Sequence, residues 1–149
     1  FSFVFSNDSG PKKPLLEVSA AQADIIALTK DGNINLRDSS LKAKNTMIRF
    51  TATSHNTDTK AILVTYGVGK DAAKQSKPYQ DTTYTEQLKK ALENNAYDAT
   101  YQKILADKLS VYRAKLNNAY GAISSTKQKT EISNFFNQLE LLAPSTTKQ

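Results

Sequence analysis

The chain contains no cysteine, no tryptophan and a single histidine. The absence of cysteine excludes disulfides, thiolate metal sites and a cysteine nucleophile. The one histidine, His55, lies in the polar run 54–59, which we predict to be an exposed hairpin loop. A lone imidazole cannot form a histidine-rich metal site, so we expect neither a bound metal nor another cofactor.

Long hydrophobic runs are also missing. No stretch of about twenty apolar residues occurs, so the sequence predicts no helix that spans a membrane. The length of 149 residues and the 39% hydrophobic content suit a domain with a real core. We divide the chain into a terminal strand and linker (1–14), a β-rich part (15–70) and a helical part (71–149) that share one core.

Positive charge is in excess but not concentrated. The net charge is +6, and only Arg37, Arg49 and Arg113 are arginines among the 20 basic residues. Proteins that read nucleic acids usually gather arginine and lysine on one face or helix, whereas here the charge is spread over the whole chain. This favours a lysine-solvated surface, with a polyanion-binding module for nucleic acid or acidic polysaccharide as the alternative prediction.

The first half of the chain carries patterns typical of β-strands. Residues 46–53 and 61–68 alternate between apolar and polar, and the loop 54–59 between them predicts an antiparallel hairpin. Residues 19–37 allow two interpretations. One is a second hairpin that turns at Asp31-Gly32, and the other is a helix from Ser19 that ends at Gly32. The strong turn signal of Asp-Gly favours the hairpin.

Helical spacing dominates the second half. Three helices are predicted, one that begins near Thr83, one over 97–120 that carries a series of tyrosines, and one over 126–142 that Pro144 ends. Strands followed by helices indicate an α+β fold, with N-terminal antiparallel β-hairpins or a small sheet and a C-terminal antiparallel layer of about three helices.

No catalytic motif supports an enzyme. The run Gly67-Val68-Gly69-Lys70 lacks the spacing of a phosphate-binding loop, so we interpret it as a turn that ends a strand. The chain also has no Gly-x-Ser-x-Gly motif to support a Ser-His-Asp triad around His55. We therefore predict a protein that is not an enzyme.

The most unusual segment is the aromatic start of the chain. Phe1, Phe3 and Phe5 alternate with other residues, and the linker 7–14 separates them from the rest. Apolar residues at a chain end need a cover, and a strand of this kind can add to the sheet of a neighbouring molecule. Phe1 itself is interpreted as a processed terminus, the remnant of a membrane anchor or a fragment boundary.

These observations predict a non-enzymatic structural or assembly protein. It would be a subunit of an extracytoplasmic or particle assembly, such as a filament, surface layer, secretion apparatus or capsid, and would form a homo-oligomer or a larger complex. Tyrosine suits both core edges and interfaces, so the tyrosine series either packs in the core or contacts another subunit. The predicted partner-binding residues are Phe1, Phe3, Phe5, Tyr97, Tyr101 and Tyr112.

Overall fold

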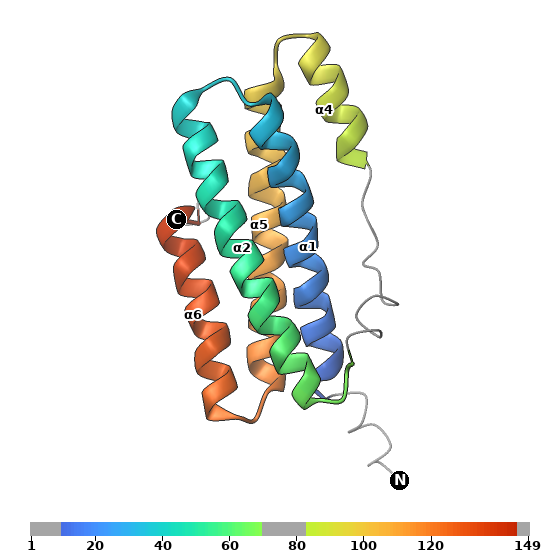
Figure 1. Cartoon of the computed structure of the whole chain (residues 1–149), viewed down its shortest axis with the longest axis vertical. Helices are drawn as coiled ribbons and strands as arrows, with labels where there is room; N and C mark the ends of the chain where they lie inside the picture. Colours follow the sequence, from blue (N-terminus) through green and yellow to red (C-terminus); the bar gives the residue numbers. More distant parts are fainter. Residues whose placement is uncertain (1–9, 70–82, 146–149) are drawn as a thin grey trace.

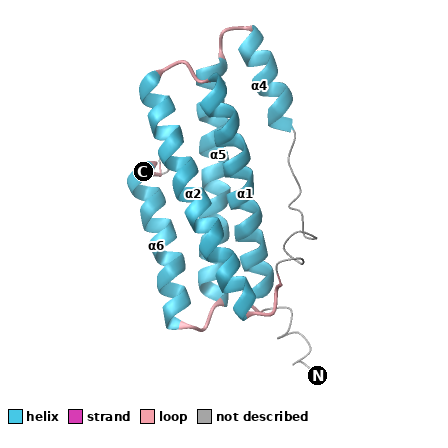
Figure 2. Ribbon diagram, in the orientation of Figure 1, coloured by secondary structure: helices cyan, strands magenta, loops and turns pink. Residues whose placement is uncertain are grey.

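The computed structural model describes residues 10–69 and 83–145, and these residues form five helices and no strand (Figure 2). The helices are α1 (Lys12–Asn35), α2 (Ser39–Thr65), α4 (Thr83–Glu93), α5 (Tyr97–Ala122) and α6 (Thr126–Leu142). The chain therefore folds as a helical bundle, and the predicted α+β class is wrong.

The error lies in the first half of the chain. The predicted strand 46–53, the loop 54–59 and the first five residues of the predicted strand 61–68 all belong to the single helix α2, which ends at Thr65. Residues 19–37 take the helical alternative instead of the favoured hairpin, and α1 begins at Lys12, inside the predicted linker 7–14. Residues 1–9, with the predicted terminal strand, lie outside the described residues.

Polar residues at buried positions explain why the helical period of α2 was missed. The buried side of this helix consists of Asn45, Ile48, Ala52, His55, Thr59, Ile62 and Leu63. From Asn45 to Ile62 their spacing of three and four residues is that of one helix face, and Leu63 lies next to Ile62. Because three of these seven residues are polar, a search for regularly spaced apolar residues finds only short alternating runs.

The same explanation holds for α1. Its buried residues include Gln22, Thr29 and Gly32 among the apolar ones. Gly32, predicted to be a turn residue, lies within the last turn of the helix, where the ring of Tyr101 passes over it. A Cβ atom at residue 32 would lie 2.5 Å from Cζ of Tyr101, so only glycine leaves enough space there.

The long helices pack as an up-and-down bundle (Figure 1). Helix α1 contacts α2 and α5, and α6 contacts the same two helices from the other side. Short connections join α1 to α2 and α5 to α6, so both pairs are antiparallel. Helix α4 packs on α5 near the α1–α2 connection, where its Leu88 joins Leu28 of α1 and Tyr97 and Tyr101 of α5 in a small second core.

Side-chain and backbone caps fix the ends of α2. The carboxylate of Asp38 accepts a hydrogen bond of 2.9 Å from the amide of Leu41 at the N-terminus. At the other end Gly67 has a φ of +86°, and the amide of Val68 donates to the carbonyl of Leu63 at 3.1 Å. This is a glycine-based helix end, so the predicted strand-ending turn in fact ends a helix.

The predictions for the second half are confirmed as helices. Helix α6 has the predicted bounds, and α5 extends the predicted segment 97–120 by two residues to Ala122. The main core combines residues of α1, α2, α5 and α6, so both halves of the chain contribute to it. No helix among the described residues is long and apolar enough to cross a membrane.

Candidate functional site

His55 lies in the middle of the bundle and not on an exposed loop. Its side chain is 1% exposed, and its ring stacks on that of Phe135 from α6 with centroids 4.2 Å apart. The prediction that His55 decorates the surface is therefore wrong. It failed because the surrounding Ser, Thr, Asn and Asp residues resemble a loop, although most of them face solvent from the other sides of α2.

A hydrogen-bonded series that we call the central network joins all four long helices through His55. Nδ1 of His55 lies 2.8 Å from the hydroxyl of Tyr112 on α5, and Nε2 lies 2.6 Å from Oε1 of Gln138 on α6. Gln22 of α1 donates to the Tyr112 hydroxyl at 2.9 Å and to Thr59 of α2 at 2.8 Å. The central network thus consists of Gln22, Thr59, Tyr112, His55 and Gln138.

The partners determine the direction of each hydrogen bond. An amide oxygen only accepts, so Nε2 of His55 carries the proton that Gln138 receives. Nδ1 of the neutral ring then accepts from the hydroxyl of Tyr112, whose oxygen in turn accepts from the amide of Gln22. The network therefore requires the uncharged form of His55.

Burial favours that uncharged form. Removal of His55 from water lowers its pKa below the ordinary value of 6.5, although the bond to Gln138 and the charge of Asp58 act in the opposite direction. Burial likewise raises the pKa of Tyr112. Neither group is accessible to a substrate, and among the described residues no buried side-chain nitrogen or oxygen lacks a partner. The geometry is that of a structural network.

A second polar cluster, the upper network, lies nearer the α1–α2 connection. The amide of Asn45 donates to the carbonyl of Thr29 at 2.7 Å and to the side chain of Asn33 at 2.8 Å. The hydroxyl of Tyr101 donates to Oδ1 of Asn45. Because Asn45 is 1% exposed, these bonds replace the water that its amide would otherwise bind.

The tyrosines that we predicted as partner-binding residues lie inside this bundle. Tyr97, Tyr101 and Tyr112 are 4%, 1% and 0% exposed, and Tyr97 donates a hydrogen bond of 2.5 Å to Asp31 of α1. Their rings build the core, so our proposal for a partner surface does not use them. Phe1, Phe3 and Phe5 lie outside the described residues.

An open groove follows from the unequal lengths of the helices. Helix α6 has 17 residues, whereas α2 has 27 and α5 has 26. At about 1.5 Å per residue, α6 is roughly 14 Å shorter than its neighbours. Figure 1 shows that it ends beside the middle of α2. Beyond its end, the space between α2 and α5 has no covering helix among the described residues.

This α2–α5 groove has a volume of about 250 Å³ and is mainly apolar. Its walls include Leu41 and Ile48 from α2 and Leu105 and Leu109 from α5. The polar side chains of Lys44, Asn45 and Gln102 lie among them. A cavity of about 150 Å³ with apolar walls can hold a benzene molecule, so the groove has room for an aromatic ring.

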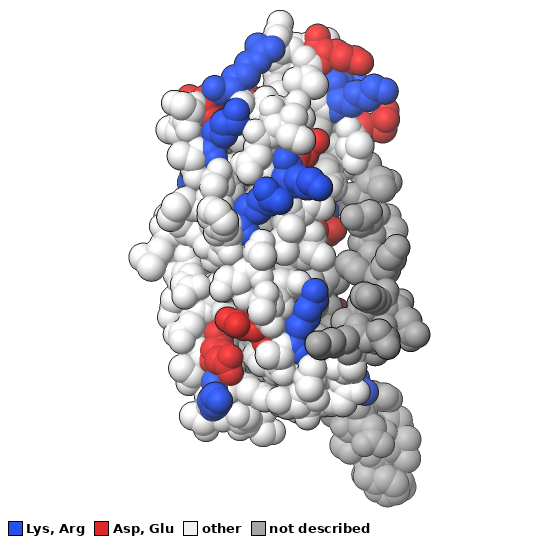
Figure 3. Space-filling view, viewed as in Figure 1, with Lys and Arg blue, Asp and Glu red and all other residues white. Residues whose placement is uncertain are grey.

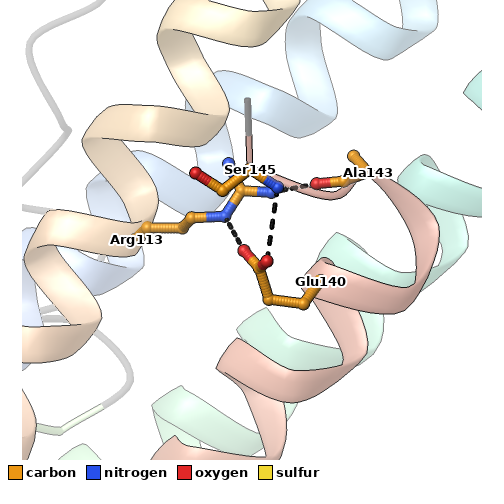
Figure 4. Close-up of polar contacts among 4 residues, drawn as sticks. All are labelled: Arg113, Glu140, Ala143 and Ser145. Carbon is orange, nitrogen blue, oxygen red and sulfur yellow. Dashed lines mark hydrogen bonds and ion pairs between the residues drawn. The ribbon is translucent and has the colours of Figure 1, made fainter. Parts of the chain in front are cut away.

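Polar contacts fix the lower end of the groove (Figure 4). Nε of Arg113 on α5 lies 2.6 Å from Oε2 of Glu140 on α6, and a second guanidinium nitrogen donates to the carbonyl of Ala143. The other oxygen of Glu140 accepts from the amide of Ser145 at 3.2 Å. This clamp attaches the end of α6 to α5 and places Ala143 and Pro144 at the groove.

The remaining surface feature is the outer side of α2. Seven exposed residues follow one another at spacings of four and three, and none is charged. They are Ala43, Met47, Phe50, Ser54, Thr57, Ala61 and Val64, which we call the outer stripe. Phe50 is 72% exposed, Val64 57% and Met47 54%.

The described residues contain no group of three or more histidine, cysteine or acidic residues that could hold a metal ion. No family model, curated protein or solved structure matches the chain. The features that can carry a functional argument are therefore the α2–α5 groove and the outer stripe.

Proposed function

We propose that the protein is a non-enzymatic assembly subunit, a helical bundle that binds other subunits through apolar surface, in an extracytoplasmic or particle assembly. The α2–α5 groove is the observation that carries this proposal. It is apolar, open and defined by the clamp at the end of α6. His55 is buried and takes part in the central network, which supports a role of its side chain in the fold.

The N-terminal aromatic segment supplies a suitable occupant for such a groove. Residues 1–6 contain three phenylalanines, and a groove of about 250 Å³ suits one of these rings. The described part of the chain offers no strand for β-addition. Docking of residues 1–6 on a neighbour would therefore rest on side chains that enter the groove, and not on backbone pairing.

The charge distribution gives less support to the polyanion alternative. Three described basic side chains, Lys108, Arg113 and Lys115, form ion pairs with acidic residues. On the face drawn in Figure 3, lysines and arginines are interspersed with acidic residues and gather in no single patch. Polyanion binding usually relies on such a patch, so we favour assembly.

Sedimentation velocity tests the role of the N-terminal segment. We expect removal of residues 1–9 to lower the sedimentation coefficient, because the docked rings are lost. A groove variant, Ala106→Glu, is expected to have the same effect because it places a charge in the apolar groove. Ala114→Glu, also exposed on α5 but outside the groove, is the matched control. Unchanged assembly in both the deletion and the groove variant would overturn the docking proposal.

A further inference from the structure

The outer stripe of α2 has the spacing of a coiled-coil seam. Its seven positions alternate between steps of four and three residues, so Met47 and Ser54 occupy a positions and Phe50 and Thr57 occupy d positions. From Ala43 to Val64 the stripe is about 32 Å long. The exposed side of a surface helix normally carries charged residues, but the seven positions of the outer stripe carry none, and the charges of Lys44 and Asp58 lie beside it.

We propose that the outer stripe binds the outer stripe of a second copy of this chain, with the two α2 helices antiparallel about a twofold axis. This inference rests on the proposed assembly role but not on the docking of residues 1–6. The face drawn in Figure 3 has an uncharged area over the middle of α2 and the adjoining part of α6. The helix is accessible there, because Met47 and Phe50 are exposed.

Charge complementarity selects the antiparallel register. Lys44 and Asp58 occupy e positions, and e positions of two antiparallel helices lie opposite each other. When Ala43 faces Ala61 of the second copy, Lys44 lies opposite Asp58, and the twofold axis repeats this pair. A shift by one heptad places threonine opposite each of these charges and loses both pairs.

The sizes of the stripe residues agree with the same register. Phe50 then faces Ser54 of the second copy, and Met47 faces Thr57, so each large side chain meets a small one. Facing positions that combine large and small residues can interdigitate without voids. The chain therefore offers steric and electrostatic complementarity to itself.

The area of the stripe indicates a weak dimer. A strip about 32 Å long and about 10 Å wide covers about 320 Å² on each copy. Stable protein pairs bury about 800 Å² per partner. We therefore expect a rapidly exchanging dimer whose sedimentation coefficient rises with protein concentration, and not a permanent one.

Charge-reversal variants test the pairing of Lys44 with Asp58. Lys44→Asp and Asp58→Lys each place like charges opposite each other, so each variant alone is expected to dimerise at least several-fold more weakly than the wild type. An equimolar mixture of the two restores both opposite-charge pairs and should recover dimerisation. Equal self-association of the two variants and the wild type would overturn this register. Circular dichroism melting curves check that both variants are folded.

Cysteine cross-linking gives a second readout, because the chain has no thiol of its own. Thr53→Cys, near the twofold axis, is expected to form a disulfide with itself. Ala43→Cys and Ala61→Cys should form dimers only when mixed, whereas parallel helices would cross-link each variant with itself. Ser110→Cys, on the exposed side of α5, is the control.

The outcomes separate this inference from the proposed function. If the full-length chain self-associates but none of the α2 variants changes its sedimentation or its cross-linking, the α2 interface is wrong and the assembly role remains. If the wild-type chain self-associates but removal of residues 1–9 leaves its sedimentation unchanged, the docking of residues 1–6 is wrong and the α2 interface remains. If the wild-type chain stays monomeric at every concentration, the homodimer and self-assembly are both excluded.

Discussion

Helix α2 has an inner face and an outer face of similar length, and both depart from the usual composition of an amphipathic helix. The inner face places Asn45, His55 and Thr59 in the core. Each of these side chains has a hydrogen-bond partner on another helix, which is Thr29 for Asn45, Gln138 for His55 and Gln22 for Thr59. The outer face exposes Met47, Phe50 and Val64 to solvent. Polar groups are therefore buried where the fold provides partners, and apolar groups are exposed where a second molecule can provide them.

This comparison predicts that substitutions on the two faces have different consequences. Those on the inner face should lower the free energy of unfolding and those on the outer face should change association. The expected effects on stability decrease from the central network to the outer stripe.

The largest loss is expected for His55→Ala. The substitution leaves a cavity beside Phe135 and removes a partner from both Tyr112 and Gln138. We expect a loss of about 3 kcal/mol in the free energy of unfolding. Urea denaturation measures it, with the exposed Thr57→Ala on the same helix as control. A loss below about 1 kcal/mol would contradict a structural role of the central network.

Gly32→Ala is expected to be the next most destabilising change. The new Cβ atom would overlap the ring of Tyr101 at 2.5 Å and disturb the bond from its hydroxyl to Asn45. Overpacking of this kind costs about 1–3 kcal/mol.

Gly121→Ala is the matched control for this glycine. No atom lies within 4 Å of a Cβ at residue 121, so alanine should be neutral or stabilising by up to about 1 kcal/mol. Thermal or urea unfolding compares the two variants. Equal effects at both glycines would contradict the close packing of Tyr101 on α1.

Acid should lower the free energy of unfolding through protonation of His55. Its pKa is lowered in the folded protein, so the unfolded chain binds a proton more readily. The contribution of neutral His55 is therefore fully present above pH 6.5 and is lost as the pH falls from that value toward the folded pKa. The slope can reach about 1.4 kcal/mol per pH unit.

Unfolding by urea at a series of pH values measures this slope. Because His55 is the only histidine, the variant His55→Gln removes the imidazole contribution entirely. The part of the slope near pH 6 that disappears in this variant belongs to His55. An identical slope in both proteins would show that His55 titrates equally in the folded and unfolded states.

A smaller effect is expected at the clamp between α5 and α6. Arg113→Lys keeps the charge but cannot bind Glu140 and the carbonyl of Ala143 together. We expect a loss of about 1–2 kcal/mol, because one charge-assisted hydrogen bond disappears. Thermal unfolding gives the value, with Lys115→Arg, at a more exposed ion pair, as control. Equal melting temperatures of wild type and Arg113→Lys would contradict the clamp.

The sequence predicted the helices whose buried positions are mostly apolar or aromatic. Helix α6, with Ile132, Phe135 and Leu139 inside, appeared with its correct bounds. In α5 the buried tyrosines and leucines follow the helical spacing, so its period was also visible.

The sequence could not reveal α1 and α2 in the same way. Their inner faces contain Gln22, Asn45 and His55, whose burial depends on partners far away in the chain. Tyr112, for example, lies 90 positions from Gln22 and 57 positions from His55. Such contacts exist only after folding, so a local pattern of apolar residues does not record them. The outer stripe became recognisable only once α2 was known to be one helix.

The most direct test of the central claim compares one substitution on the outer stripe with one elsewhere on the surface. Phe50→Glu and Val111→Glu both place a charge at an exposed apolar position, the first on the outer stripe and the second on α5. Both should change stability by less than about 0.5 kcal/mol. Sedimentation velocity over a range of concentrations should show that Phe50→Glu weakens self-association at least tenfold, whereas Val111→Glu resembles the wild type. Equal self-association of Phe50→Glu and the wild type would contradict the account.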